Sequence, residues 1–319
     1  MSEEKTTEIA GERESVFSKT WALVLFALIA CALWGSAFPG VKTGYELFGI
    51  ETTGSRILFA GYRFTAAGII TLIIVSVFEG RFVTIKKSSV PYIFAQGMLQ
   101  TTVQYVFFYI GLANTTGIKG SVIDGSSGFF SIIAAHFILR NEKMSLRKVA
   151  GCVIGFAGVI AVNLEAGEMT GGFALNGELL VLLSTIAYGV SSVTQKLLTS
   201  RETPNAITAY QLIFGGLVLI AIGLFTGGHI ESPDFRAAAL FGYLVLLSTA
   251  AFTLWANLLK HNPVGKVAIF GFTIPVFGSI FSAMFLKESF FTVNNILALV
   301  LVCIGIVIVN YEKGTDQLR

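Results

Sequence analysis

Residues 34–42 read WGSAFPGVK and residues 188–196 read YGVSSVTQK, so each stretch opens with an aromatic residue and a glycine and reaches a lysine eight positions later. Two further pairs recur in the same order: Lys119 with Lys266, and FAGVIAVN at 156–163 with CIGIVIVN at 303–310. Apolar segments resemble one another by chance, so one such match means little. Three matches in the same order predict that the chain contains two related halves.

The composition of the chain is that of a membrane protein. Of its 319 residues, 54% are hydrophobic and 13% are charged, against about 25% charged residues in a soluble domain. A soluble fold would expose apolar patches that promote aggregation, whereas a bilayer solvates them. A spanning helix takes about 20 residues, so ten helices leave only short loops and no separate catalytic domain. The net charge of +3 is too small for a nucleic-acid-binding surface.

Hydropathy predicts an all-α integral membrane protein with ten transmembrane helices. The helices are expected at 20–41, 57–78, 90–112, 117–139, 147–164, 175–198, 205–226, 236–260, 264–286 and 292–311. The polar N-terminal residues 1–19 are expected to form a disordered cytoplasmic tail. Residues 313–319 are expected to form a short cytoplasmic tail at the other terminus.

Positive charges predict the orientation of these helices. Sixteen of the 22 Lys and Arg residues fall in the N-terminus, the even-numbered loops and the C-terminus, and five fall on the opposite side. Because positive residues near helix ends stay cytoplasmic, both termini are expected in the cytoplasm, with the protein in the plasma or inner membrane. Residues 20–164 and 165–312 would each supply five helices, and this odd number inverts the second repeat relative to the first. Inverted repeats are common in secondary transporters, whose substrate site lies between the repeats near the midplane.

These residues resemble the pattern of the EamA family in the drug/metabolite transporter superfamily. The resemblance covers nearly all of residues 20–311 and rests on Trp34-Gly35-Ser36-Ala37-Phe38 with Lys42, Tyr62-Arg63-Phe64, Glu142, Glu288, Pro275, Gly158 and Gly305. Gln211 and Tyr188 stand where the family has arginine and tryptophan, so the two halves are not expected to contribute equally to a site. The resemblance implies ten helices, cytoplasmic termini and transport of small metabolites such as amino acids.

Two charged residues fall within predicted spans. A central Arg costs about 2.5 to 3.5 kcal/mol on insertion scales, so Arg63 is expected either to brace neighbouring helices and reach the headgroups, or to anchor a substrate carboxylate or phosphate through bidentate bonds. Asp124 is the only carboxylate deep within a predicted span. It is expected to pair with Arg63 or another structural partner, to bind a substrate amine, or to carry a coupling proton.

Uncharged polar side chains extend the candidate substrate site. Gln96, Gln100 and Gln104 recur every four residues and therefore share one face of a helix. Three amides buried without partners would be costly, so the stripe either faces a water-filled cavity or bonds to neighbouring helices. Tyr188 and Gln195 lie seven residues apart on a polar face of a later helix.

Mid-span aromatic residues complete the candidate site. Aromatic residues in this position are more often part of the core, but Trp34 and Trp255 would suit an apolar or cationic part of a substrate. Asn257 lies one turn from the predicted end of the same helix as Trp255. The candidate substrate-binding residues are Trp34, Arg63, Gln96, Gln100, Gln104, Asp124, Tyr188, Gln195, Trp255 and Asn257.

The sequence predicts a secondary transporter that exports small polar metabolites or facilitates their movement, by alternating access at a cavity between the repeats. Amino acids or related compounds are the first candidates for the substrate. Import of a choline-like cation or a sugar phosphate is the alternative, and a membrane protein without transport activity is a third possibility. A membrane-embedded enzyme would need a cluster of nucleophile and base, which the sequence lacks.

No cofactor or metal site is expected, because the histidines lack ligand spacing and Cys31, Cys152 and Cys303 are isolated, which favours buried free thiols. The expected partners are a small-molecule substrate and the lipid bilayer, and no nucleic acid. The GxxxG motif at 151–155 predicts close helix packing within the fold or at a dimer contact. The chain is expected to act as a monomer or homodimer.

Overall fold

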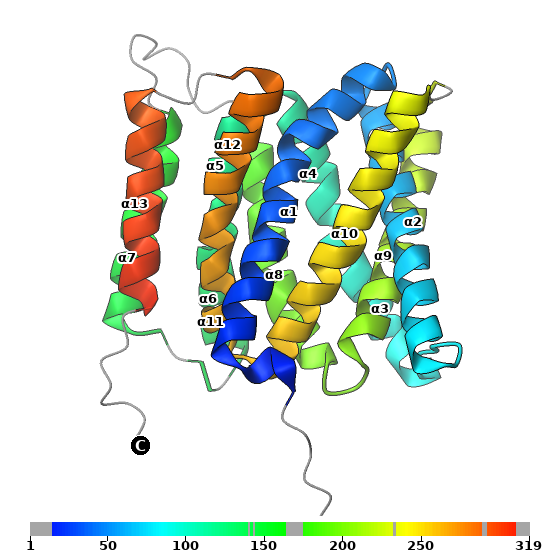
Figure 1. Cartoon of the computed structure of the whole chain (residues 1–319), viewed down its shortest axis with the longest axis horizontal. Coiled ribbons are helices and arrows are strands. Elements are labelled where there is room, and N and C mark those ends of the chain that lie inside the picture. Colours follow the sequence, from blue (N-terminus) through cyan, green and yellow to red (C-terminus); the bar gives the residue numbers. More distant parts are fainter. Residues whose placement is uncertain are drawn as a thin grey trace, which may run out of the picture.

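The computed structural model describes residues 15–139, 141–142, 144–163, 175–231, 234–288 and 292–310. The regular elements in these ranges are all helices, which stand side by side, and α1 begins at the end of the bundle at which α13 ends (Figure 1). Apart from residues 15–19, the predicted tails lie outside the described residues, as does the predicted boundary between the halves. The α-helices are α1 (Thr20–Leu47), α2 (Thr53–Glu79), α3 (Val90–Gly97), α4 (Gln104–Ala113), α5 (Gly117–Gly125), α6 (Ser127–Ile138), α7 (Leu146–Asn163), α8 (Glu178–Leu198), α9 (Pro204–Phe225), α10 (Phe235–His261), α11 (Val264–Ala268), α12 (Ile274–Leu286) and α13 (Val293–Asn310).

In the part of the chain that the structure describes, seven helical segments are long and apolar enough to cross a membrane. Five of them are α1, α2, α8, α9 and α10, and the other two combine α5 with α6 and α11 with α12. The remaining predicted spans fall on α3 with α4, on α7 and on α13, which are helical but do not belong to this set. The chain is therefore a membrane protein, while the number of ten spans stays a prediction.

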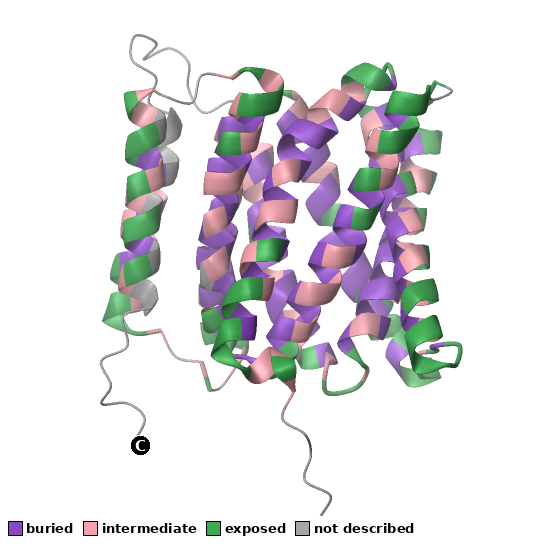
Figure 2. Ribbon diagram, viewed as in Figure 1, coloured by how far each residue is buried: buried purple, intermediate pink, exposed green. Residues whose placement is uncertain are grey.

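The outer surface of the bundle is rich in exposed apolar side chains. Figure 2 shows exposed residues along the outward faces of the helices and buried residues between them. Phe78 on α2 is 87% exposed and Phe225 at the end of α9 is 91% exposed. Large exposed apolar surfaces mark contact with lipid or another protein, so this surface suits the bilayer.

Three of the predicted continuous helices are interrupted. The π-helix η3 (Met98–Val103) joins α3 to α4, Ser126 separates α5 from α6, and the 3-10 helix η4 (Ile269–Thr273) separates α11 from α12. Hydropathy does not reveal such breaks, because they change the backbone hydrogen bonds and leave the apolar character unchanged. Discontinuous helices and π-helical turns are common at binding sites in membrane proteins.

The segments α5–α6 and α11–α12 lie antiparallel, and each is capped by a glutamate that follows the other. Glu288, after α12, accepts hydrogen bonds from the first two backbone N–H groups of α5, at 2.8 and 2.9 Å. Glu142, after α6, accepts from the first two backbone N–H groups of α11, at 2.9 and 3.2 Å. Helix N-termini leave such donors unsatisfied and carry partial positive charge, so a carboxylate is a favourable partner.

Two lysines hold the helix ends that precede these caps. Lys42 on α1 donates from Nζ to carbonyl oxygens at the end of α4 and in the following turn, at 3.4 and 2.6 Å. Lys196 on α8 donates to two carbonyl oxygens at the end of α10, at 3.0 and 2.5 Å. We refer to Lys42 with Glu288 as the α4–α5 clamp, and to Lys196 with Glu142 as the α10–α11 clamp. The two halves of the chain thus use matching residues in matching contacts.

Helices α7 and α13 pack against each other through glycines. A Cβ atom on Gly305 would lie 2.6 Å from the carbonyl oxygen of Gly151 and 2.9 Å from the backbone nitrogen of Gly155. The GxxxG motif therefore serves a contact within this chain. Cys303 on α13 is exposed and Cys152 on α7 is half-buried, so neither is buried as expected, whereas Cys31 on α1 is buried.

Candidate functional site

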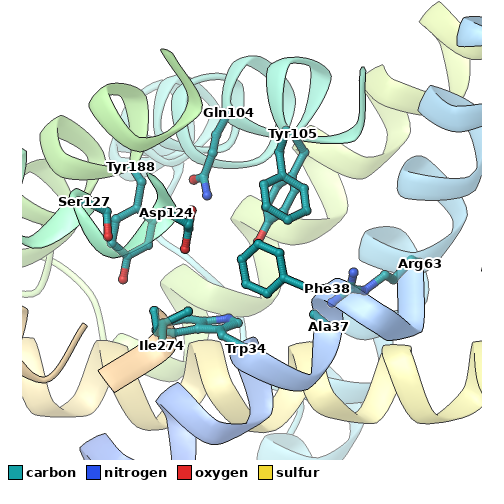
Figure 3. A pocket seen from close by; sticks show the side chains of 11 residues that line it. Trp34, Ala37, Phe38, Arg63, Gln104, Tyr105, Asp124, Ser127, Tyr188 and Ile274 are labelled. Atoms are coloured by element: carbon teal, nitrogen blue, oxygen red, sulfur yellow. The ribbon is translucent and has the colours of Figure 1, made fainter. Parts of the chain in front are cut away.

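A pocket lies at the centre of the bundle, between α1, α4, α5 and α8 (Figure 3). Its volume is about 30 Å³, by a measure in which one water molecule needs about 10–15 Å³. The pocket therefore has room for about two water molecules, and ten of its eleven lining residues are buried. Its lining consists of Trp34, Ala37, Phe38, Arg63, Gln104, Tyr105, Phe108, Asp124, Ser127, Tyr188 and Ile274.

One end of the pocket is rich in acceptor oxygens. Asp124 lies in the last turn of α5, just before the break at Ser126, and its side chain is near those of Gln104 and Tyr188 in Figure 3. Among the described residues, its carboxylate has no hydrogen-bond or ion-pair partner. Gln104 Oε1 and the Tyr188 hydroxyl are buried and also lack a partner there. Buried polar atoms normally have a hydrogen-bond partner, so these three groups are available to a ligand or to water.

Arg63 occupies the opposite end of the pocket, beyond Phe38 and Tyr105 (Figure 3). It is 2% exposed. Its Nε donates to the Leu244 carbonyl oxygen at 3.1 Å and to Ser248 Oγ at 3.0 Å, both on α10.

A further bond ties Arg63 to the helix that carries Tyr105. Its Nη1 donates to the hydroxyl of Tyr109 on α4 at 2.9 Å, and its guanidinium carbon lies 5.0 Å from the ring centre of Phe64. Arg63 thus braces α2 against α10 and α4. The structure does not pair it with Asp124, because no ion pair joins the two in the described part of the chain.

An aromatic cluster forms a wall of the pocket around Trp34. Its ring centre lies 5.1 Å from that of Trp255, 5.5 Å from that of Phe252 and 5.9 Å from that of Tyr188, with the ring planes steeply inclined in each pair. Edge-to-face packing of this kind is favourable. Trp255 lies behind Trp34, outside the lining, and the indole nitrogens of both lack a partner among the described residues.

Four other predicted site residues lie outside the lining. Gln96 donates to Gln100 Oε1 at 2.8 Å and to a carbonyl oxygen of α8 at 3.0 Å, so it bonds helices together. Asn257 likewise links helices, since it donates to Asn205 on α9 at 2.6 Å. Gln195 is buried, and within the described ranges neither of its amide atoms has a partner. The glutamine stripe therefore reaches the pocket only at Gln104.

Several residues that line the pocket are not among the site residues predicted from the sequence. Phe38 follows Trp34 by four residues, and Ser127 follows Asp124 by three, so helical spacing places each on the face of its predicted neighbour. Ile274 comes from the start of α12, and no pattern in the sequence connects it to this site. The unselected lining residues are Ala37, Phe38, Tyr105, Phe108, Ser127 and Ile274.

The chain is similar to known transporters along most of its length. An "Uncharacterized transporter" of Archaeoglobus fulgidus is 26% identical over 91% of this chain and 98% of its own length. The "Uncharacterized transporter YetK" of Bacillus subtilis is 27% identical over 73% of this chain and 72% of its own. A WAT1-related chloroplastic protein of Arabidopsis thaliana is 23% identical over 98% of this chain and 74% of its own.

The chain also matches a solved structure in its fold and a family pattern in its sequence. A crystal structure with 17% sequence identity covers 92% of this chain and 97% of its own, with a TM-score of 0.71, which shows a shared fold. The pattern of the EamA-like transporter family matches residues 21–164 and again residues 175–311. Together the two matches cover nearly the whole chain, and they agree with the resemblance found in the sequence. The chain therefore belongs to the EamA-like transporter family.

Proposed function

We propose that this protein is a secondary transporter of small polar metabolites and that the central pocket is its substrate site. Amino acids or related compounds are the first candidates for the substrate. The observation that carries this proposal is a small pocket inside a membrane protein, lined mostly by buried residues, that contains a carboxylate and unpartnered polar atoms. Charged side chains within membrane segments are costly and mark solute pathways. The family membership supports transport and leaves the substrate open.

The mechanism that we propose is alternating access between two inverted five-helix repeats, 20–164 and 165–312. Broken helices near the pocket support it, because transporters place substrate sites at such breaks. The proposed arrangement has ten spans and both termini in the cytoplasm, in the plasma or inner membrane. The proposed partners are a small-molecule substrate and the bilayer, with the chain acting as a monomer or homodimer and without catalytic activity.

A second candidate function is the transport of a choline-like cation. It is favoured by the Asp124 carboxylate beside the rings of Trp34 and Tyr188, since carboxylates and aromatic faces both attract cations. Arg63 would be the contact for a sugar phosphate instead. In either case Asp124 is also the candidate for carrying a coupling proton.

Counterflow with the variants of these two charges tests the site. If Arg63 anchors the substrate, Arg63→Ala abolishes exchange of amino acids and spares cations. Unchanged amino-acid exchange by a folded Arg63→Ala protein removes that role. If Asp124 serves only the coupling proton, Asp124→Asn retains exchange and loses its response to a pH gradient. A pH response that persists in this variant excludes proton coupling through Asp124.

A further inference from the structure

We infer that Asp124, and not Arg63, is the charge that contacts the substrate, so that the substrate is a primary amine recognised through its ammonium group. This inference rests on the proposed transport function and narrows its substrate class. Arg63 already has three polar acceptors on α10 and α4, at 2.9 to 3.1 Å, and is stacked on Phe64. Its charge is part of the framework that joins three helices.

The Asp124 end offers what an ammonium group needs. A primary ammonium has three N–H donors, and three acceptor oxygens come together here: the Asp124 carboxylate, Gln104 Oε1 and the Tyr188 hydroxyl. Each of the three groups lacks a hydrogen-bond or ion-pair partner among the described residues. Trp34 and Tyr188 add aromatic surface that attracts a cation.

The two charges lie at opposite ends of the pocket. Phe38 and Tyr105 lie between Asp124 and Arg63 (Figure 3). An α-amino acid carries its ammonium and carboxylate groups on one carbon, so one end of the pocket must be chosen. The free acceptors at the Asp124 end select the ammonium.

Binding to three matched compounds tests this assignment without requiring transport. The probes are L-alanine, ethylamine, which lacks the carboxylate, and propionate, which lacks the amine. Binding to the purified full-length protein is followed by tryptophan fluorescence, because Trp34 lines the pocket. We expect alanine and ethylamine to bind and propionate to fail, and Asp124→Asn to weaken ethylamine binding at least tenfold.

The matched variants separate this assignment from a general loss of structure. Glu51→Gln removes an exposed carboxylate far along the chain from Asp124 and is expected to leave ethylamine binding within a few-fold of wild type. If propionate binds and Arg63→Lys weakens this binding, Arg63 contacts the substrate and the inference is wrong. The proposed transport function is not affected by that outcome. The inference is also wrong if Asp124→Asn leaves ethylamine binding unchanged, or if neither alanine nor ethylamine binds to the wild-type protein. In that case counterflow of other solutes tests the transport function separately.

A separate observation supports a second inference: we propose that the α4–α5 clamp and the α10–α11 clamp are latches of the two gates of the transport cycle. The clamps lie at opposite ends of the bundle. Asn262, one of the residues held by Lys196, also donates to the carbonyl oxygen of Phe17, so the α10–α11 clamp lies at the end where α1 begins. Each clamp joins a lysine from one half to a glutamate from the other.

The contacts explain why one clamp must open at a time. Each clamp fixes the turn between two pocket-flanking segments by four charge-assisted hydrogen bonds. All eight bonds are formed in this structure, in which the central pocket is small and lined mostly by buried residues. Opening the pocket to one end requires the turn at that end to separate from its lysine and glutamate. The clamp at the other end then keeps the pocket sealed.

Accessibility of a pocket cysteine tests the latches, and its result does not depend on the substrate. Ala37→Cys places a thiol in the pocket lining, after Cys31, Cys152 and Cys303 are replaced by serine. A membrane-impermeant thiol reagent is added to right-side-out and to inverted membrane vesicles. We expect Glu142→Gln to raise labelling several-fold from the face at which α1 begins and to lower it from the other face. Glu288→Gln is expected to have the reverse effect.

Two sets of variants keep this test decisive. Lys196→Met and Lys42→Met remove the other half of each clamp and should reproduce the effects of Glu142→Gln and Glu288→Gln, respectively. Glu51→Gln, an exposed carboxylate in the loop after α1, should change labelling from neither face. Equal changes from both faces, or no change in any clamp variant, would overturn the proposal.

Discussion

The carboxylate of Glu288 accepts a hydrogen bond from the backbone N–H of Gly117 at 2.8 Å, although the two residues are 171 positions apart. The bond joins the end of one antiparallel segment to the start of the other, and Glu142 makes the matching bond at the opposite end. These two caps connect the halves of the chain at the two ends of the bundle. The fold therefore depends on carboxylates that a hydropathy profile treats as loop residues.

Removing either cap should destabilise the protein. We expect Glu288→Ala and Glu142→Ala each to lower the free energy of unfolding by about 1–3 kcal/mol, because two helix N–H donors lose a charged partner. Thermal unfolding in detergent measures the loss. Glu51→Ala, an exposed carboxylate, is the control and should change stability little. Equal stability of all three variants would contradict this role.

The contact between α7 and α13 should tolerate no side chain at Gly305. Gly305→Ala places a methyl group 2.6 Å from a carbonyl oxygen of α7, and such overpacking costs about 1–3 kcal/mol. Gly242→Ala on α10 meets nothing within 4 Å and should be neutral or stabilising by up to about 1 kcal/mol. Thermal unfolding of the two variants compares them directly, and equal melting temperatures would show that α13 shifts freely.

Arg63 should be required for stability. Arg63→Met leaves buried acceptors on α10 and α4 without their donor, so we expect a loss of about 3 kcal/mol. Arg63→Lys keeps the charge but cannot reproduce the planar arrangement of donors, so its stability should be intermediate. Denaturation monitored by circular dichroism measures both. A fully stable Arg63→Met protein would show that the framework bonds contribute nothing.

Trp34 should contribute to substrate affinity through its ring. Trp34→Ala is expected to weaken binding about tenfold, because a cation–π contact is worth about 0.5–2 kcal/mol, whereas Trp34→Phe should retain much of the affinity. Trp21→Ala, on the same helix but 58% exposed, is the matched control. The substrate concentration at half-saturation in exchange assays measures the affinity of each variant. Wild-type affinity in the Trp34→Ala protein would show that Trp34 does not contact the substrate.

The sequence predicts much of this architecture, and particular residues show where it stops. The apolar segments of the sequence coincide with the helices. The repeated lysines at positions 42 and 196 are the lysines of the two clamps. Arg63 and Asp124 both reach the central pocket, as their cost in lipid predicts. Their separation, and the presence of Ile274 from the start of α12 in the pocket lining, depend on how distant helices pack. Spacing along the chain holds no information on that packing.

The breaks at Ser126 and in η4 are a second limit of the sequence. Both occur inside stretches whose hydropathy is that of one continuous helix. Pro275 and the glycines at 125 and 128 are local signals of a break. These residues alone do not show where the helix breaks. The structure shows that Gly125 packs against Pro275, because a Cβ atom on Gly125 would overlap the proline ring.

Counterflow in proteoliposomes tests whether this chain moves small solutes through the buried pocket around Asp124. Vesicles loaded with an unlabelled amino acid, choline or a sugar phosphate are diluted into the labelled compound. We expect transient accumulation of label for a solute with an amino group, and loss of this accumulation when Ala37→Trp fills the pocket. Absence of accumulation for every solute by a folded wild-type protein, or full exchange by the folded Ala37→Trp variant, would contradict it.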